Sequence, residues 1–262
     1  MMSESIAGVR LGIAQAGLKV ADQDDLVVVE FCPGTRTASL FTQNAFRAAP
    51  VVVAERHCSV NQGHAQLLLI NTGNANAGTG AMGITAAESC CDAVADLASV
   101  NRSEVLPFST GVIGEPLDAD RIAAALPSAI YDLRADNWQR AAAAILTTDT
   151  RPKLRTIEVD VGGNVCRITG ITKGAGMICP NLATMLAFIA TDAEIEQSSL
   201  DTLLRRANSV SFNRITVDGD TSTNDAVTLS ATGLSGLRVD SDTPAFAEAL
   251  STLMIELAQD IV

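Results

Sequence analysis

The sequence has few aromatic residues, no long apolar run and fewer basic than acidic residues. Aromatic side chains make up 3% of the 262 residues, which argues against a surface on which nucleic-acid bases stack. Eighteen Lys+Arg stand against 30 Asp+Glu, a formal net charge of −12, so the surface field repels phosphate backbones and anionic membranes. The N-terminal MMSESIAGVR lacks the basic start and apolar stretch of a secretory signal. We therefore expect a cytoplasmic protein whose partners include neither nucleic acid nor a membrane.

Metal-binding patterns are also missing. The six cysteines include no CxxC pair and no pair spaced with histidine for zinc. We therefore predict no metal site and no disulfide, and we interpret the cysteines as small apolar thiols. The two histidines, His57 and His64, lie in no motif and are predicted on a surface segment.

Short apolar runs rich in β-branched residues predict strands, most of them buried on both faces. They span residues 26–31, 51–54, 67–70, 157–161, 185–189 and 226–229. Helical patterns lie between them, and neither an internal repeat nor a domain boundary is visible. The pattern predicts a mixed α/β fold built as a layered sandwich in one domain, residues 1–262.

Four helices are predicted. The first covers residues 85–98, with Thr85 and Glu88 as a capping box, and two others cover residues 136–146 and 199–207. The last begins at Thr243 with Pro244 in its first turn. Its apolar pattern still runs at Val262 without a terminating glycine or proline, from which we expect a sequence that is cut short.

Polar or glycine-rich segments at 71–80, 109–116, 173–185 and 212–225 adjoin predicted strands, where binding loops are usually mounted. In the third of them, Pro180 predicts a bend before Thr184, which opens a buried strand. A threonine hydroxyl becomes a useful nucleophile when its own freed α-amino group acts as the base, which requires cleavage of the Ala183–Thr184 bond. An ordinary β-branched residue opening a strand has the same local pattern, so this segment alone leaves both interpretations open.

Six blocks of the chain together resemble the ornithine acetyltransferase family, the bifunctional glutamate N-acetyltransferases of arginine biosynthesis. They are FTQNAFRAAPV, NTGNANAGTG, STGVIGEPL, LTTDTRPK, KGAGMICPNLATMLAFIATDA and FNRITVDGDTSTND, in the family's order from residue 41 to 225. The resemblance implies the self-processing fold shared with the aminopeptidase DmpA. It also implies a further C-terminal domain that this sequence does not contain.

The resemblance implies that the precursor cleaves itself into residues 1–183 and 184–262, which remain together as a hetero-oligomer. Thr184 then accepts acetyl from N-acetyl-L-ornithine and passes it to L-glutamate, with no cofactor. Acetyl-CoA stays open as a second donor. By the same resemblance Thr110 and Gly111 form the oxyanion hole, and Lys173 binds substrate.

The resemblance also assigns a substrate-binding threonine to the TTDT segment, for which Thr150 is preferred and Thr148 stays open. The acidic block at 217–225, with Asp218, Asp220 and Asp225, is compatible with a cation loop. Because it lacks the twelfth-position ligand of an EF-hand, we prefer a structural polar loop near the site. Two rival functions are a self-processing aminopeptidase or amidase that uses water as acceptor, and an inactive remnant that binds amino acids.

Overall fold

The computed structural model describes residues 4–20, 22–176 and 185–262. Their strands form two mixed sheets. Sheet A has the order β1 (Val9–Ala14), β2 (Leu26–Phe31), β4 (Leu67–Asn74), β5 (Val105–Val112). Only the β4–β5 pair in it is parallel.

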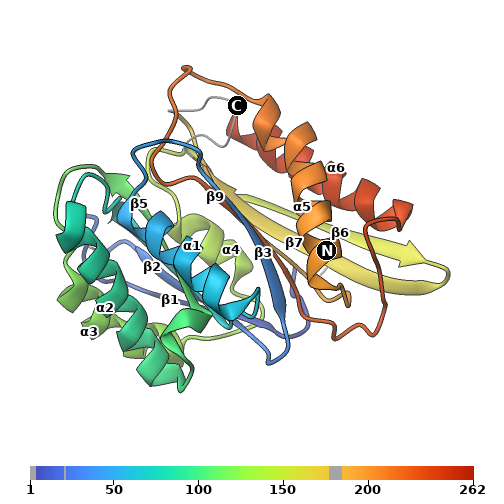
Figure 1. Ribbon diagram of the computed structural model, residues 1–262, viewed down its shortest axis with the longest axis horizontal. Helices are drawn as coiled ribbons and strands as arrows, with labels where there is room; N and C mark the ends of the chain where they lie inside the picture. Colours follow the sequence, from blue (N-terminus) through green and yellow to red (C-terminus); the bar gives the residue numbers. More distant parts are fainter. Residues whose placement is uncertain (1–3, 21, 177–184) are drawn as a thin grey trace.

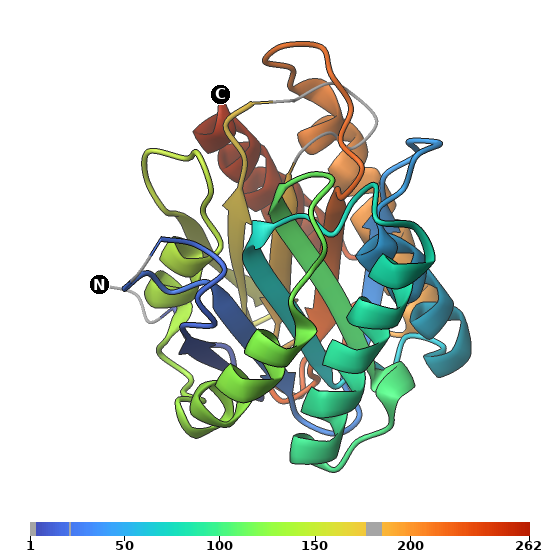
Figure 2. The ribbon, with the colours of Figure 1, turned by 90° about the vertical axis from the view of Figure 1, so that its left-hand side faces the viewer.

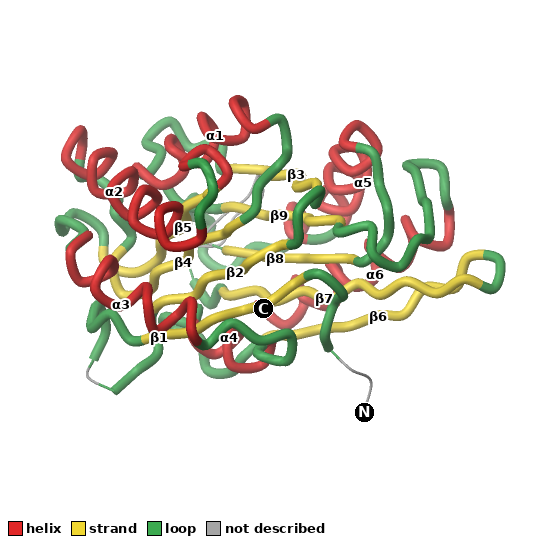
Figure 3. Tube along the Cα trace, turned by 90° about the horizontal axis from the view of Figure 1, so that it is seen from below, coloured by secondary structure: helices red, strands yellow, loops and turns green. Residues whose placement is uncertain are grey.

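Sheet B has the order β3 (Arg36–Phe41), β9 (Ala226–Ala231), β8 (Leu186–Thr191), β7 (Asn164–Lys173), β6 (Lys153–Val161). Its central strands β8 and β9 run parallel, and every other neighbouring pair is antiparallel. The far end of the β6–β7 hairpin extends beyond the rest of the molecule (Figure 3).

The two sheets pack face to face around one apolar cluster. This cluster includes Val29 and Leu68 from sheet A with Ile171 and Phe188 from sheet B. The rings of Phe108 on β5 and Phe188 meet edge to face, with centroids 5.0 Å apart. Helix α4 (Trp138–Ala144) adds the fully buried Trp138 to the same cluster.

Helices cover the outer faces of both sheets. Sheet A is covered by α1 (Ala49–Asn61), α2 (Gly80–Ala98) and α3 (Ala119–Tyr131), and sheet B by α5 (Gln197–Val210) and α6 (Pro244–Ile261) (Figure 1). Figure 2, seen from the side of α2 and α3, shows sheet A in front of sheet B, with α6 behind both. The predicted layered α/β sandwich is therefore confirmed, in the order helix, sheet, sheet, helix.

Several elements lie where the sequence predicts them. Strands β8 and β9 are buried along their whole length, as their short apolar runs indicate. Helix α5 buries Leu200, Leu203 and Leu204 on one face, and α6 begins with Pro244 after the N-cap Thr243.

Two predictions about local structure are wrong. Residues 51–54 belong to helix α1, which begins at Ala49 with Pro50 in its first turn, and the buried Val51, Val53 and Ala54 are only one side of it. Such a short apolar run fits a helix face as well as a strand. Helix α2 begins at Gly80, so Thr85 lies inside it and donates to the Ala81 carbonyl instead of capping the helix.

The prediction for His57 is also wrong. This side chain is 4% exposed, and its Nδ1 lies 2.7 Å from the Val105 carbonyl oxygen, so it joins α1 to the start of β5. His64 is exposed as predicted. In the described part of the chain, no helix combines the length and apolarity that crossing a membrane requires.

Candidate active site

The ends of five strands, two from sheet A and three from sheet B, meet at one end of the molecule. In sheet B, Lys173 at the end of β7 pairs with Leu186 at the start of β8, which pairs with Ala226 at the start of β9. In sheet A, the parallel strands β4 and β5 end together, with Thr110 near the end of β5. The predicted segments therefore converge although they are far apart in the sequence.

A contact between the sheets joins two of the predicted site residues. The Lys173 ammonium donates to Thr110 Oγ1 at 2.7 Å and to Thr147 Oγ1 at 3.2 Å. Lys173 is 3% exposed and Thr110 6% exposed. This lysine is therefore a buried cation held by two hydroxyl groups.

Gly111 permits the close approach of β4 and β5 beside Thr110. Its φ is 138°, a value that residues with side chains rarely adopt, and a Cβ at this position would lie 2.3 Å from the Gly73 carbonyl carbon. Any side chain here would push the two strand ends apart and displace Thr110.

The predicted cleavage site, Ala183 and Thr184, lies outside the described residues. The next residue, Met185, is buried, and its N–H donates to Asp225 Oδ1 at 2.9 Å. Its carbonyl accepts the Ala226 N–H at 3.2 Å. The backbone that directly follows the predicted nucleophile is therefore fixed to the start of β9.

Asp149 is a site residue that the sequence reasoning missed. Its fully buried carboxylate accepts hydrogen bonds from Lys153 Nζ at 2.5 Å and from the Gly174 N–H at 2.7 Å. It thereby ties the TTDT segment to the residue after Lys173. Thr148 and Thr150, on either side of it, are exposed, and within the described residues the threonine of this segment that contacts Lys173 is Thr147.

Burial shifts the pKa values of two of these groups toward neutrality. It lowers the pKa of Lys173 to about 8, against the opposing effect of Asp149 and Asp225. It raises the pKa of Asp225 to about 8, although the Met185 N–H and Ser222 act in the other direction. For Asp149, burial alone would raise the pKa, but its hydrogen bonds to Lys153 and Gly174 lower it overall.

Hydrogen bonds from buried amide side chains and one hydroxyl join the ends of β4 and β5 to each other and to the segment before β9. Ser109 Oγ donates to Asn71 Oδ1 at 2.6 Å, and Asn71 Nδ2 donates to the Asn74 carbonyl at 2.9 Å. Asn224 Nδ2 donates to the carbonyls of Ala75 and Ser109, at 2.6 and 2.9 Å. The end of the acidic block is therefore part of the polar scaffold, in agreement with the structural loop that the sequence favours.

The same block offers little for a cation. Asp218 and Asp220 are exposed, whereas Asp225 is 0% exposed and bound to Met185. Among the residues that the structure describes, no three His, Cys, Asp or Glu side chains are grouped as a metal site would require.

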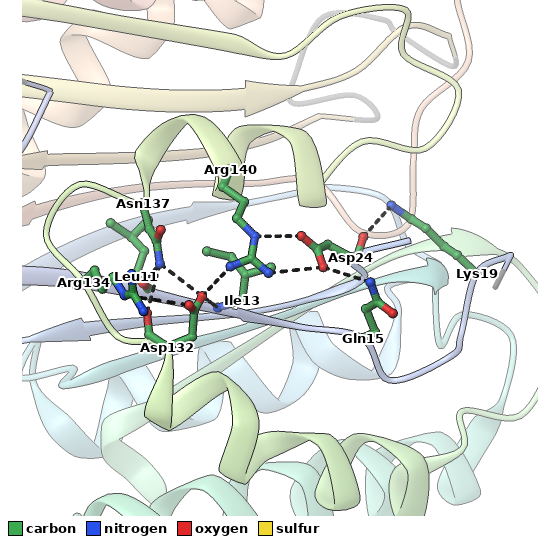
Figure 4. A network of polar contacts seen from close by, with 9 residues as sticks. All are labelled: Leu11, Ile13, Gln15, Lys19, Asp24, Asp132, Arg134, Asn137 and Arg140. Atoms are coloured by element: carbon green, nitrogen blue, oxygen red, sulfur yellow. Dashed lines mark hydrogen bonds and ion pairs between the residues drawn. The ribbon is translucent and has the colours of Figure 1, made fainter. Parts of the chain in front are cut away.

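A second polar network surrounds helix α4, which directly precedes the segment with Thr147 and Asp149 (Figure 4). Arg140 on α4 donates to Asp24 at 2.9 Å and to Asp132 at 2.8 Å. Lys19 Nζ donates to the carbonyl of Ala144, the last residue of α4, at 3.0 Å. Arg140 and Lys19 therefore hold α4 in place, and the chain that follows this helix carries Thr147, which contacts Lys173.

Comparison with known proteins first defines the class. The L-aminopeptidase D-Ala-esterase/amidase of Ochrobactrum anthropi, described as a variant of the Ntn hydrolase fold, superposes with a TM-score of 0.60 over 98% of this chain and 84% of its own, at 12% identity. The chain therefore has this layered fold.

The family follows from closer relatives. The model of the ArgJ family matches residues 10–262. The arginine biosynthesis bifunctional protein ArgJ of Methylococcus capsulatus is 49% identical over 98% of this chain and 63% of its own length. The chain belongs to the ArgJ family, and it spans about 63% of the length of that relative.

A solved relative carries a ligand. The ornithine acetyltransferase of Mycobacterium tuberculosis, complexed with ornithine, is 28% identical, with a TM-score of 0.59 over 69% of this chain and 95% of the solved chain.

Proposed function

We propose that the protein is a self-cleaving acetyltransferase of arginine biosynthesis that moves acetyl from N-acetyl-L-ornithine to L-glutamate. Thr184 is its nucleophile, Thr110 and Gly111 form its oxyanion hole, and Lys173 and Thr150 bind substrate. The observation that carries the proposal is the contact of Lys173 with Thr110 beside the start of β8, in a member of the ArgJ family.

Cleavage between Ala183 and Thr184 would leave two fragments that share sheet B. Strand β8, from the second fragment, pairs with β7 from the first, and β9 pairs with β3. These ladders explain how the fragments would stay together as a hetero-oligomer. The share of this chain matched by the solved Mycobacterium chain, 69%, is also about the share that precedes Thr184.

The reaction would proceed by two acyl transfers. The Thr184 Oγ attacks the acetyl carbonyl while the freed α-amine takes the hydroxyl proton. That proton goes to the departing ornithine amine as the C–N bond breaks. The amine of glutamate then attacks the acetyl ester, loses a proton to the α-amine, and Thr184 is released as the alcohol.

The charges near the site suit substrates that carry carboxylates. Lys153 is paired with the carboxylate of Asp149, which also acts on Lys173, while burial raises the pKa of Asp225 to about 8. A pocket of about 390 Å³ lies beside them, and its lining includes Lys19, Thr147 and the two carboxylates of Asp24 and Asp149. The buried ammonium of Lys173 therefore supports the binding of a substrate carboxylate, and the acidic residues of the pocket support the binding of a substrate amine.

The name of the Methylococcus relative, a bifunctional protein, supports a second donor, for which acetyl-CoA is the candidate. N-acetylornithine and acetyl-CoA are therefore tested separately as acetyl donors to glutamate.

The assay that tests this function uses the complete protein, because this chain spans 63% of its Methylococcus relative. Incubation with N-acetylornithine and glutamate is expected to give N-acetylglutamate and ornithine in equal amounts. Release of free acetate without N-acetylglutamate would identify an amidase instead. A Thr184→Ala protein serves as the control and is expected to give neither product.

A further inference from the structure

The Lys173–Thr110 contact fixes the direction of the hydrogen bond between them. A lysine ammonium has three donors and no acceptor. In the contacts at 2.7 and 3.2 Å, the oxygens of Thr110 and Thr147 must therefore both accept. Lys173 is 3% exposed, so water does not compete freely for its protons.

This direction determines what the Thr110 hydroxyl can do. A hydroxyl that accepts from an ammonium keeps one proton, which it cannot return to that ammonium. No residue in the described part of the chain accepts this proton. The Thr110 hydroxyl is therefore a donor without a partner among these residues, at the end of β5.

We propose that Lys173 is a positioning residue that holds Thr110 as a hydrogen-bond donor toward the oxyanion of the reaction. This inference rests on the proposed function, in which Thr110 and Gly111 face that oxyanion. It adds a role for Lys173 to substrate binding, because the third ammonium proton remains available to a substrate carboxylate. A positive charge behind the hydroxyl also strengthens it as a donor.

The surroundings of Lys173 make this role dependent on pH. Burial lowers its pKa to about 8, and the charged groups that act on it are Asp149, Asp225, Lys153 and Lys19. Above this pH the neutral amine gains a lone pair and can accept the Thr110 proton. The hydroxyl then turns away from the reacting carbonyl, so the rate should fall.

A double-mutant cycle tests the inference in the complete protein. Thr110→Val removes the hydroxyl at nearly constant shape, and Lys173→Met removes the ammonium. Each is expected to lower kcat by about 100-fold, the loss typical of one oxyanion donor. If Lys173 acts through Thr110, the double variant is no slower than the slower single variant. Losses in kcat that multiply in the double variant would overturn the proposal, whereas a rise in KM in Lys173→Met reports only its role in substrate binding.

The conservative variant Thr110→Ser is the matched control, because it keeps a hydroxyl. Lys173→Met should again cost about 100-fold in this background, unlike in Thr110→Val. The kcat of the wild type and of Thr110→Ser should decrease above pH 8, and the kcat of Thr110→Val should not show this decrease. The same decline in Thr110→Val would contradict the proposal.

Rates are expressed per cleaved molecule. Some variants could cleave too slowly for acetyl transfer to be measured. For these variants, the same double-mutant cycle compares the rates of cleavage before Thr184, because the attack of the hydroxyl in that reaction also forms an oxyanion. If the wild type transfers no acetyl, the proposed function fails. If it transfers acetyl and the losses multiply, only the role of Lys173 fails.

Discussion

At the residue scale, the site consists of single groups whose surroundings determine their ionisation. Asp225 is 0% exposed, its Oδ1 accepts the Met185 N–H, and its Oδ2 has no hydrogen-bond partner among the residues that the structure describes. A buried polar atom without a partner is rare in folded proteins and costs stability.

Asp225 gives a prediction for stability against pH. Its pKa is about 8 in the folded chain and 3.8 as the ordinary value, so the folded state holds the proton more tightly. The stability that this group contributes is full below pH 3.8 and is lost as the pH rises through 8. One such proton changes the free energy of unfolding by up to about 1.4 kcal/mol per pH unit.

Asp225→Asn should remove this dependence. Urea unfolding of Thr184→Ala protein, which is expected to stay in one piece, would be compared with and without Asp225→Asn at pH 5 and pH 8. From pH 5 to pH 8 the parent should lose stability as Asp225 ionises, and the Asn variant should not. The free energy of unfolding of the Asn variant should therefore rise relative to that of its parent over this interval. An equal difference at both pH values would show that Asp225 ionises as freely in the folded state as in the unfolded chain.

Single residues also mark the limit of the sequence reasoning. Thr110, Gly111 and Lys173 were assigned by resemblance, yet the bond from Lys173 to Thr110 joins residues 63 positions apart. No periodicity encodes such a contact, because it arises only when two sheets pack together. Asp149 was missed for the same reason, since its partners Lys153 and Gly174 converge through the fold.

At the scale of elements, the apolar pattern found β8 and β9 but missed β5, although all three strands are buried over most of their length. Strand β8 is apolar up to Thr191 and was found, whereas Pro107, Ser109 and Thr110 interrupt the apolar pattern of β5. Helix α1 was mistaken for a strand because its apolar run is only four residues long.

The alignment of the two sheets should depend on the ring pair between β5 and β8. Phe188 is 2% exposed and lies 5.0 Å from Phe108, centroid to centroid. Phe188→Ala is expected to lower the free energy of unfolding by about 3–5 kcal/mol. It should also reduce acetyl transfer, since Thr110 and Lys173 approach from opposite sheets.

Phe46→Ala is the matched control, because Phe46 is 63% exposed. It should change the free energy of unfolding by less than about 0.5 kcal/mol. Urea unfolding of both variants in the uncleaved Thr184→Ala background measures this, and equal losses would contradict the assigned role of the ring pair.

At the scale of the whole molecule, the sheets hold the two sides of the site in register. Sheet A supplies Thr110 and Gly111, and sheet B supplies Lys173, the start of β8 and Asp225. The proposed cut before Thr184 falls between β7 and β8, which are neighbours in one sheet. Cleavage would thus free a new N-terminus without separating the halves of the fold.

The central claim is that Thr184 becomes an N-terminal nucleophile, and mass spectrometry of the complete protein tests it most directly. After incubation with N-acetylornithine in the absence of glutamate, we expect a fragment that begins at Thr184 and carries one acetyl group on that residue. The Thr184→Ala protein should remain a single unlabelled chain. Acetyl transfer at the normal rate by an uncleaved chain, or an acetyl group on another residue, would contradict the account.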